Sequence, residues 1–233
     1  MVVVCIAAGG TGSRAGGEIP KQFQLLCGEP VLAHTFRALA PFADRIIIGV
    51  SPQWREHAVN IINNKGIIWA EAGTHRNATL YNCSQAVKEK NALFLTHDAA
   101  RPLIDPKIIT ENLRIARDNP ACAVGTAVPA TDTILHAKSE RLLAIPPRPQ
   151  MYQAQTPQTF LLGLFEKVYH EAGEKAAQAT DALALFHRAG IPVLLSPGNP
   201  RNIKITYPHD LLFAESMMGC RPASSLAGDK NQS

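Results

Sequence analysis

Residues 1–22, MVVVCIAAGGTGSRAGGEIPKQ, restrict the possible folds more than any other stretch of the sequence. The segment from Val2 to Ala8 is apolar and rich in β-branched residues, as in buried parallel strands. A glycine-rich loop follows, with Arg14 inside it and Lys21 just beyond it. Glycine permits positive φ and lets backbone N–H groups approach an anion closely. The stretch therefore predicts an α/β fold that binds phosphate at the carboxyl edge of its sheet.

Two familiar phosphate-binding motifs do not fit this loop. Gly10, Gly12 and Ala15 satisfy the dinucleotide fingerprint G-x-G-x-x-A, but Pro20 interrupts the helix that this motif needs. The next expected strand, 45–50, also ends without the carboxylate that would bind a ribose. A P-loop needs Gly-Lys-Ser or Gly-Lys-Thr, and the sequence contains neither.

A third pattern, A-A-G-G-x-G-x-R followed by P-K-Q, is the signature of nucleotidyltransferases and is complete here. It runs from Ala7 to Arg14 and resumes at Pro20, Lys21 and Gln22. An ordinary glycine-rich turn would leave the two cations unexplained. We therefore favour a nucleotide-binding loop of the nucleotidyltransferase type.

Composition narrows the class of protein. The chain has 233 residues, enough for one large α/β domain, with ordinary fractions of hydrophobic (46%) and charged (18%) residues. The net charge of +4 comes without a run of Lys and Arg, which argues against nucleic-acid binding and suits a small anionic substrate. Apolar runs are too short to span a membrane and no signal peptide is evident, so we expect a cytoplasmic protein that binds no membrane.

The cysteines are consistent with that compartment. No C-x-x-C motif occurs, and the number of cysteines is odd: Cys5, Cys27, Cys83, Cys122 and Cys220. We expect free thiols, buried or without function, in a reducing environment.

Strands alternate with helices along most of the chain. The expected strands are 2–8, 45–50, 66–70, 92–96, 121–128, 192–196 and 202–206; the expected helices are 31–40, 54–63, 78–88, 106–117, 161–172, 180–189 and 208–218. This order predicts a Rossmann-like, mainly parallel sheet with helices on both faces. Functional residues should then cluster at the carboxyl ends of strands, in the loops that begin at Gly9, Ser51, Ala72 and His97.

Residues 129–155 interrupt this alternation. Two short apolar segments, 133–135 and 142–145, flank a polar turn, and the prolines of PPRP follow. The pattern predicts a protruding β-arm with an extended return. A two-stranded ribbon is marginally stable alone, so we expect it to pack on a partner subunit in a homodimer. We thus expect one domain over 1–218, including this dimerisation arm, and a disordered tail over 219–233.

From residue 3 to about residue 218, the sequence resembles the cytidylyltransferases that make CDP-linked sugar alcohols. The matching segments are AAGGTGSR, PKQF, GTHRNATL, HDAARP, AVPATDTI, the arginine of PPRPQ, AQTPQTF, TDALAL and NIKITYPHDL. The resemblance implies a nucleotidyltransferase fold and a reaction in which the phosphate of a polyol phosphate attacks the α-phosphorus of CTP, with Mg²⁺. The products are a CDP-polyol and pyrophosphate. Both reactants are anions, so positioning and charge neutralisation should dominate catalysis.

The resemblance also implies roles for individual residues. The catalytic cations would be Arg14, Lys21 and Lys204. The residues around the nucleotide would be Ala7, Ala8, Gly9, Gly10, Gly12, Gly73, Arg76 and Thr79. The acceptor would meet Asp98, Arg101, Thr133 and Arg148, with Asp98 also facing the metal and the two arm residues reaching the neighbouring subunit's site.

Taken one at a time, these residues also have ordinary structural explanations. A strand lysine such as Lys204 often protects a sheet edge, and Asp98 could precede and cap a helix. As an ordered set, however, the residues favour the functional interpretation.

Two acceptors stay open within the family. One group of relatives acts on 2-C-methyl-D-erythritol 4-phosphate for isoprenoid synthesis, and the other on D-ribitol 5-phosphate to make CDP-ribitol. The isoprenoid enzymes are the more widespread group, which favours them. The local sequence is closer to the ribitol enzymes at SPQW, IPPRPQMYQ and TDA, and Ala182 stands where the isoprenoid enzymes have Glu. Functions of another class, a nucleotide-binding regulator without turnover or a dinucleotide oxidoreductase, are the alternatives to both.

Overall fold

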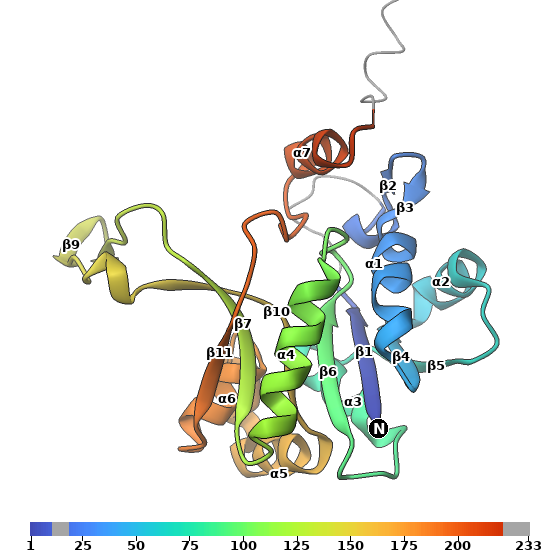
Figure 1. The fold of residues 1–233 in the computed structure, drawn as a ribbon, viewed down its shortest axis with the longest axis horizontal. Coiled ribbons are helices and arrows are strands. Elements are labelled where there is room, and N and C mark those ends of the chain that lie inside the picture. Colours follow the sequence, from blue (N-terminus) through green and yellow to red (C-terminus); the bar gives the residue numbers. More distant parts are fainter. Residues whose placement is uncertain (11–18, 221–233) are drawn as a thin grey trace, which may run out of the picture.

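The computed structural model describes residues 1–10 and 19–220. Within these ranges seven strands form one sheet, in the order β11-β7-β10-β6-β1-β4-β5 (Figure 1). The strands are β1 (Val2–Ala8), β4 (Arg45–Val50), β5 (Ile67–Glu71), β6 (Leu93–Asp98), β7 (Ala123–Pro129), β10 (Tyr152–Leu161) and β11 (Val193–Pro197). All neighbouring pairs are parallel except those of β10, which is antiparallel to β6 and β7. The expected mainly parallel α/β sheet is confirmed.

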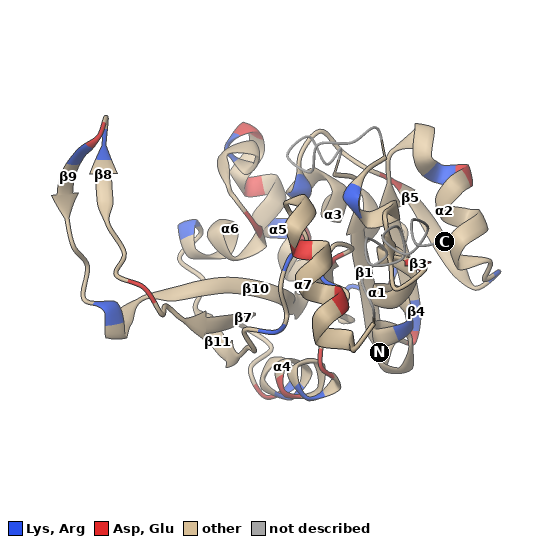
Figure 2. Ribbon diagram, turned by 90° about the horizontal axis from the view of Figure 1, so that it is seen from above, with Lys and Arg blue, Asp and Glu red and all other residues tan. Residues whose placement is uncertain are grey.

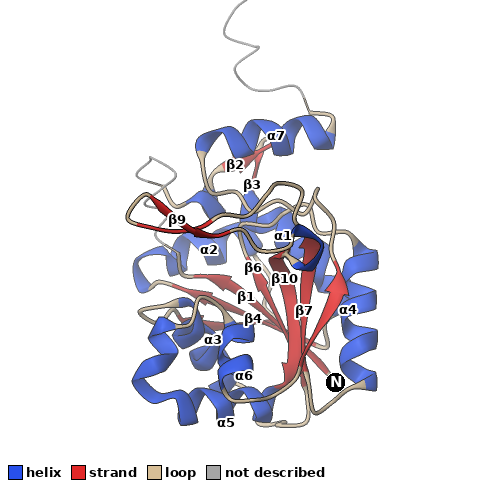
Figure 3. Cartoon of the chain, turned by 90° about the vertical axis from the view of Figure 1, so that its left-hand side faces the viewer, coloured by secondary structure: helices blue, strands red, loops and turns tan. Residues whose placement is uncertain are grey.

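Helices cover both faces of this sheet (Figure 3). One face carries α1 (Val31–Leu39), α2 (Arg55–Ile62) and α4 (Pro106–Asp118); the other carries α3 (Arg76–Gln85), α5 (Leu162–Ala172) and α6 (Ala182–Arg188). Strand β1 is apolar throughout because it is buried on both sides: Val4 and Ile6 face the first core, and Val3 and Cys5 the second.

The register of the sheet brings the functional loops together. Ala7 is paired with Asp98, Ala8 with Val50, and Val50 with Glu71. The carboxyl ends of β1, β4, β5 and β6 therefore lie along one edge, and the loops that follow them start side by side.

Two features of the sheet differ from the sequence prediction. Strand β10 begins where the sequence predicted only the extended return of the arm. It was not predicted because Pro157 and several polar residues are untypical of a central strand. Its register shifts between Ala154 and Gln158, which accommodates the proline within a central strand. The expected strand at 202–206 is wrong: that segment joins no sheet, and Ile205 N–H donates to the Ala100 carbonyl at 2.8 Å.

The expected arm is present. Strands β8 (His136–Lys138) and β9 (Arg141–Ala144) form a hairpin that projects away from the large sheet in two views (Figures 1 and 2). The apolar side chains of Leu135, Leu142, Leu143 and Ile145 are at least half exposed on it.

The end of the chain packs beside its beginning. Helix α7 (Pro208–Met218) lies over the short strands β2 (Leu25–Leu26) and β3 (Glu29–Pro30), around a small core that includes Leu26, Ile205 and Ala214. No helix in the described ranges is long and apolar enough to cross a membrane. The expected disordered tail lies, apart from Gly219 and Cys220, outside the described residues.

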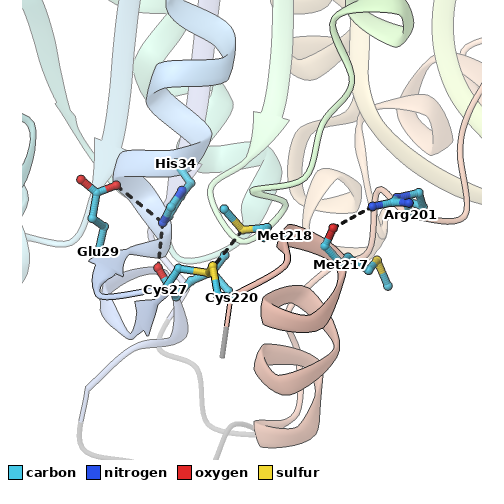
Figure 4. Close-up of a disulfide and its surroundings, with 8 residues drawn as sticks. Cys27, Glu29, His34, Arg201, Met217, Met218 and Cys220 are labelled. Atoms are coloured by element: carbon cyan, nitrogen blue, oxygen red, sulfur yellow. Dashed lines mark hydrogen bonds and ion pairs between the residues drawn. A yellow bond between two sulfur atoms is a disulfide. The ribbon is translucent and has the colours of Figure 1, made fainter. Parts of the chain in front are cut away.

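A disulfide joins these two regions, so the expectation of free thiols is wrong for one pair. Cys27, on the β2–β3 turn, is bonded to Cys220, just after α7 (Figure 4). The sequence separation of 193 residues gives no local pattern from which to predict the pair. Cys5, Cys83 and Cys122 are free thiols, and the first two are buried as expected.

Replacing Cys27 by Ser should lower the free energy of unfolding by roughly 2–5 kcal/mol, because the bridge restricts the unfolded chain across a long loop. Cys220→Ser should have the same effect, and the double variant should lose no more than either single one. Urea unfolding without reductant measures this, with Cys122→Ser as the control. Additive losses, or wild-type stability in both single variants, would contradict a stabilising bridge.

Candidate active site

A cavity of about 350 Å³ opens at the carboxyl edge of the sheet. Of the residues predicted from the sequence, it is lined by Ala7, Gly9, Gly10, Lys21, Gly73, Arg76, Thr79, Asp98 and Lys204. Gln22, Thr74, His75, Ala99, Ala100 and Thr206 complete the described lining. Ala8 ends β1 just beside it. Gly12 and Arg14 lie outside the described residues.

Among the described residues, three cations converge on the carboxylate of Asp98, the last residue of β6. Arg76 Nε donates to Oδ1 at 2.8 Å, and Lys204 Nζ lies 2.8 Å from Oδ2. Arg101 Nε lies 3.8 Å from Oδ2. The cations come from the start of α3, the segment before α7 and the turn after β6, so one carboxylate connects three separate parts of the chain.

Asp98 stays ionised in this setting. Burial acts to raise the pKa of its carboxyl, but the charges of Arg76, Lys204 and Arg101 together hold the pKa well below its usual range. The described lining also contains Lys21, so the cations of the cavity outnumber its carboxylate. The site is therefore suited to anionic ligands.

The turn after β5 lies against the end of β1. A Cβ on Gly9 would collide with the side chain of Ala72, and one on Gly73 would lie 2.8 Å from the backbone of α3. Both positions therefore require glycine. The Thr79 hydroxyl accepts from Gly73 N–H at 3.0 Å and donates to the His75 carbonyl at 3.3 Å. Its side chain thus holds the turn that forms this wall of the cavity.

Behind Asp98, the fully buried His97 holds the turn after β6. Its Nε2 lies 3.1 Å from the Arg101 carbonyl, and its Nδ1 lies 3.0 Å from Thr156 Oγ1. The Thr156 hydroxyl accepts from Asp98 N–H at 3.2 Å, so its own proton goes to Nδ1 and the histidine proton lies on Nε2. Burial lowers the pKa of His97 to about 4. The ring is therefore neutral at neutral pH.

Three of the predicted acceptor residues do not line the cavity. Arg101 is buried beside it, and its Nη1 donates to the Asn202 carbonyl at 2.7 Å. Thr133 and Arg148 lie on or near the exposed arm, which projects away from the large sheet (Figure 2). Within one subunit, the structure does not bring these two residues to Asp98.

Several contributing side chains were missed by the sequence interpretation. Gln158 accepts from Arg76 Nη1 at 3.5 Å and donates to Asp181 at 2.8 Å, which steadies the arginine. Thr156 and Gln158 lie in β10, whose position the sequence did not reveal. For Gln22, the one feature of the sequence that pointed to the site was its place in the P-K-Q segment.

The described residues do not fit a metal held by the protein alone. Asp98 is the one carboxylate in the described lining, and both of its oxygens face cations. No cluster of three or more His, Cys, Asp or Glu side chains that could hold a metal occurs in these ranges. Mg²⁺ takes about six oxygen ligands. The prediction that Asp98 faces a metal gains no support from this geometry.

A mainly parallel sheet with a glycine loop at its carboxyl edge and cations around one carboxylate is the arrangement expected of an α/β nucleotidyltransferase, and comparison with known proteins assigns the chain to that class. The family model described as 2-C-methyl-D-erythritol 4-phosphate cytidylyltransferase matches residues 1–220. A protein of that name from Geotalea uraniireducens is 34% identical over 228 residues, covering 93% of this chain and 96% of its own length. The chain belongs to the 2-C-methyl-D-erythritol 4-phosphate cytidylyltransferase family.

Solved structures agree with this assignment. A 4-diphosphocytidyl-2C-methyl-D-erythritol synthase from Anaerococcus prevotii is similar with a TM-score of 0.82, over 94% of this chain and 98% of that one. At 24% identity, this likeness concerns the fold alone. The 2-C-methyl-D-erythritol 4-phosphate cytidylyltransferase from Francisella tularensis has a TM-score of 0.80 at 25% identity, covering 93% and 99% of the two chains. The resemblance inferred from the sequence motifs is confirmed.

The buried His97 predicts a specific pH dependence of stability. The unfolded chain takes up a proton on this histidine below about pH 6.5, whereas the folded chain resists protonation until about pH 4. The unfolded state then binds more protons, so the stability of the wild type falls as the pH drops from 6.5 to 4. His97→Gln should reduce the loss between pH 7 and 4.5 by about 2–3 kcal/mol.

Urea unfolding at both pH values measures this difference, and His136→Gln, at an exposed position on the arm, is the matched control. An equal loss in wild type and His97→Gln would show that His97 is not held neutral by the fold.

Proposed function

We propose that the chain transfers CMP from CTP to the phosphate of 2-C-methyl-D-erythritol 4-phosphate, releasing pyrophosphate. The observation that carries the proposal is the match to this family over residues 1–220, together with the cation-rich cavity that the matched motifs form. The same match favours methylerythritol phosphate over ribitol phosphate as the acceptor.

The chemistry requires no nucleophile from the protein. An oxygen of the acceptor phosphate forms a bond to the α-phosphorus of CTP, and the bond from that phosphorus to the bridging oxygen of the β-phosphate breaks. Two anions must approach each other, so the protein's contribution is to position them and neutralise their charge. Lys21 and Lys204 supply that charge from opposite ends of the sequence, and Arg14 joins them by its place in the motif.

The remaining assignments follow the motifs and the cavity. The backbone from Ala7 to Gly12 and the turn with Gly73, Arg76 and Thr79 receive the nucleotide. Asp98 lies on the acceptor side, and Arg101, buried beside the cavity, supports it through their ion pair. Since the described donors do not form a resident metal site, Mg²⁺ belongs to the substrate as its complex with CTP.

A pyrophosphate-release assay with a panel of substrates tests the proposal. CTP with 2-C-methyl-D-erythritol 4-phosphate should give turnover, whereas D-ribitol 5-phosphate should give far less, because a site built around one set of hydroxyls rejects another. ATP and GTP should be poor donors in a pocket sized for a pyrimidine. Faster turnover with ribitol phosphate would reverse the acceptor assignment, and CTP binding without any turnover would indicate a regulator.

We further propose that the active enzyme is a homodimer in which each arm completes the partner's site. The arm exposes Leu135, Leu142, Leu143 and Ile145, and a two-stranded ribbon is marginal without a surface to cover it. Arg148, in the segment that returns from the arm, is exposed and does not line the cavity of its own subunit. An exchange of arms across a two-fold axis supports both the ribbon and the site.

Mixing two inactive variants tests the shared site. A mixed dimer of Lys21→Ala and Arg148→Ala has one site with both lesions and one with neither, so random exchange should restore about a quarter of wild-type activity. Lys21→Ala mixed with Lys204→Ala is the control, because both lesions lie on the same side of the site and no intact site can form. A mixture that stays inactive although exchange is demonstrated would exclude shared sites.

A further inference from the structure

The backbone where β1 enters the glycine loop has its carbonyl groups occupied in succession. The Ala7 carbonyl accepts from Ala99 N–H at 3.1 Å. Gln22 Nε2 donates to the Ala8 carbonyl at 2.8 Å and to the Gly10 carbonyl at 2.9 Å. Ser51 Oγ donates to the Gly9 carbonyl between them at 3.2 Å.

Gln22 is built into this position. Its side chain is only 3% exposed, and both hydrogens of its amide are directed to carbonyls of one short segment. It directly follows Lys21 in the 3₁₀ turn Lys21–Phe23, so the same turn carries a cation of the cavity and the clamp on the loop. Ser51 comes from the end of the neighbouring strand β4, which the register places beside Ala8.

The orientation of these carbonyls determines what the loop offers to a ligand. A peptide unit is planar and trans, so the carbonyl of one residue and the N–H of the next point in opposite directions. Holding the Ala8 and Gly9 carbonyls on Gln22 and Ser51 therefore directs the Gly9 and Gly10 N–H groups away from these side chains. Glycine peptides rotate easily, and a rotated unit would present a carbonyl dipole to a phosphate.

We propose that Gln22 and Ser51 are positioning residues that fix the peptide planes of the glycine loop, so that it presents N–H groups and not carbonyls to the triphosphate. The inference rests on the proposed function insofar as the loop receives CTP. It adds a specific requirement: the side chain at position 22 must donate two hydrogen bonds. A carboxylate of the same size and shape would repel both carbonyls.

Binding of CTP by calorimetry, with KM values for both substrates, tests the clamp. Gln22→Glu should weaken CTP binding about 25-fold or more, since two hydrogen bonds of about fivefold each are lost. Ser51→Ala, a milder change at a partly exposed site, should weaken it about fivefold. The KM for the acceptor should change little in either variant. Gln24→Glu is the matched control, because Gln24 is also an amide but donates to the Ile19 carbonyl outside this segment.

The pH dependence of CTP binding distinguishes the loss of these two hydrogen bonds from general damage to the fold. In the Gln22→Glu variant, burial beside two carbonyls should raise the pKa of the introduced carboxyl above its ordinary value of about 4.3. At pH 5 a substantial fraction is then protonated and donates one hydrogen bond, so the defect should shrink compared with pH 8. Gln22→Leu should show the same defect at both pH values. Wild-type CTP affinity in Gln22→Glu and Ser51→Ala would overturn the inference, and so would a pH-independent defect of the glutamate variant. A wild-type chain that fails to bind CTP would instead overturn the proposed function.

Discussion

The ionised carboxylate of Asp98 is the interaction on which the cavity depends. Arg76, Arg101 and Lys204 carry like charges, and without the carboxylate they would repel each other in a partly buried space. Removing one partner of a buried ion pair commonly costs about 3–5 kcal/mol, because the other charge is left uncompensated. Asp98 therefore sets the spacing of cations that no single secondary-structure element could hold together.

The position of Asp98 follows from the sheet and not from its own loop. It ends β6, where the parallel register pairs it with Ala7 at the start of the phosphate loop. The neutral ring of His97 fixes the turn behind it. The protonation of His97, the strand register and the charges of three cations thus all act on one side chain, and this explains why the cavity forms at this edge of the sheet.

Much of the parallel part of the fold could be predicted from the sequence. Strands such as β1 and β4 are continuous apolar runs, and helices such as α4 have one apolar face, so their periodicity was sufficient. Strand β10 could not be recognised in this way. Most of it is buried, yet Gln155, Thr156 and Gln158 find side-chain hydrogen-bond partners in distant parts of the chain. Only these tertiary contacts make such a polar segment a strand. The isoleucines on both sides of Lys204 predicted a strand. In the structure they pack into a small core instead, without pairing to a neighbouring strand.

The residues of the site that would contact the substrates could be predicted from the sequence. The residues that hold those side chains and loops in place could be predicted less well. Lys21, Asp98 and Lys204 could be named because anionic substrates require charge in recognisable motifs. Thr156 and Ser51 act on backbone groups from distant parts of the chain, and such contacts leave no spacing to recognise. His97 contacts the nearby Arg101 carbonyl, but its second partner, Thr156, is equally distant. The pairing of Cys27 with Cys220 is invisible for the same reason.

That pairing gives the molecule an unusual covalent topology. The bond turns residues 27–220 into a closed ring, and the exposed hairpin of β8 and β9 lies on this ring. A protease that cuts the hairpin once opens the ring but releases no fragment, because the two pieces remain attached through sulfur. Physical separation of the halves requires reduction as well as cleavage, so a nicked molecule keeps Lys21 and Lys204 in one covalent unit.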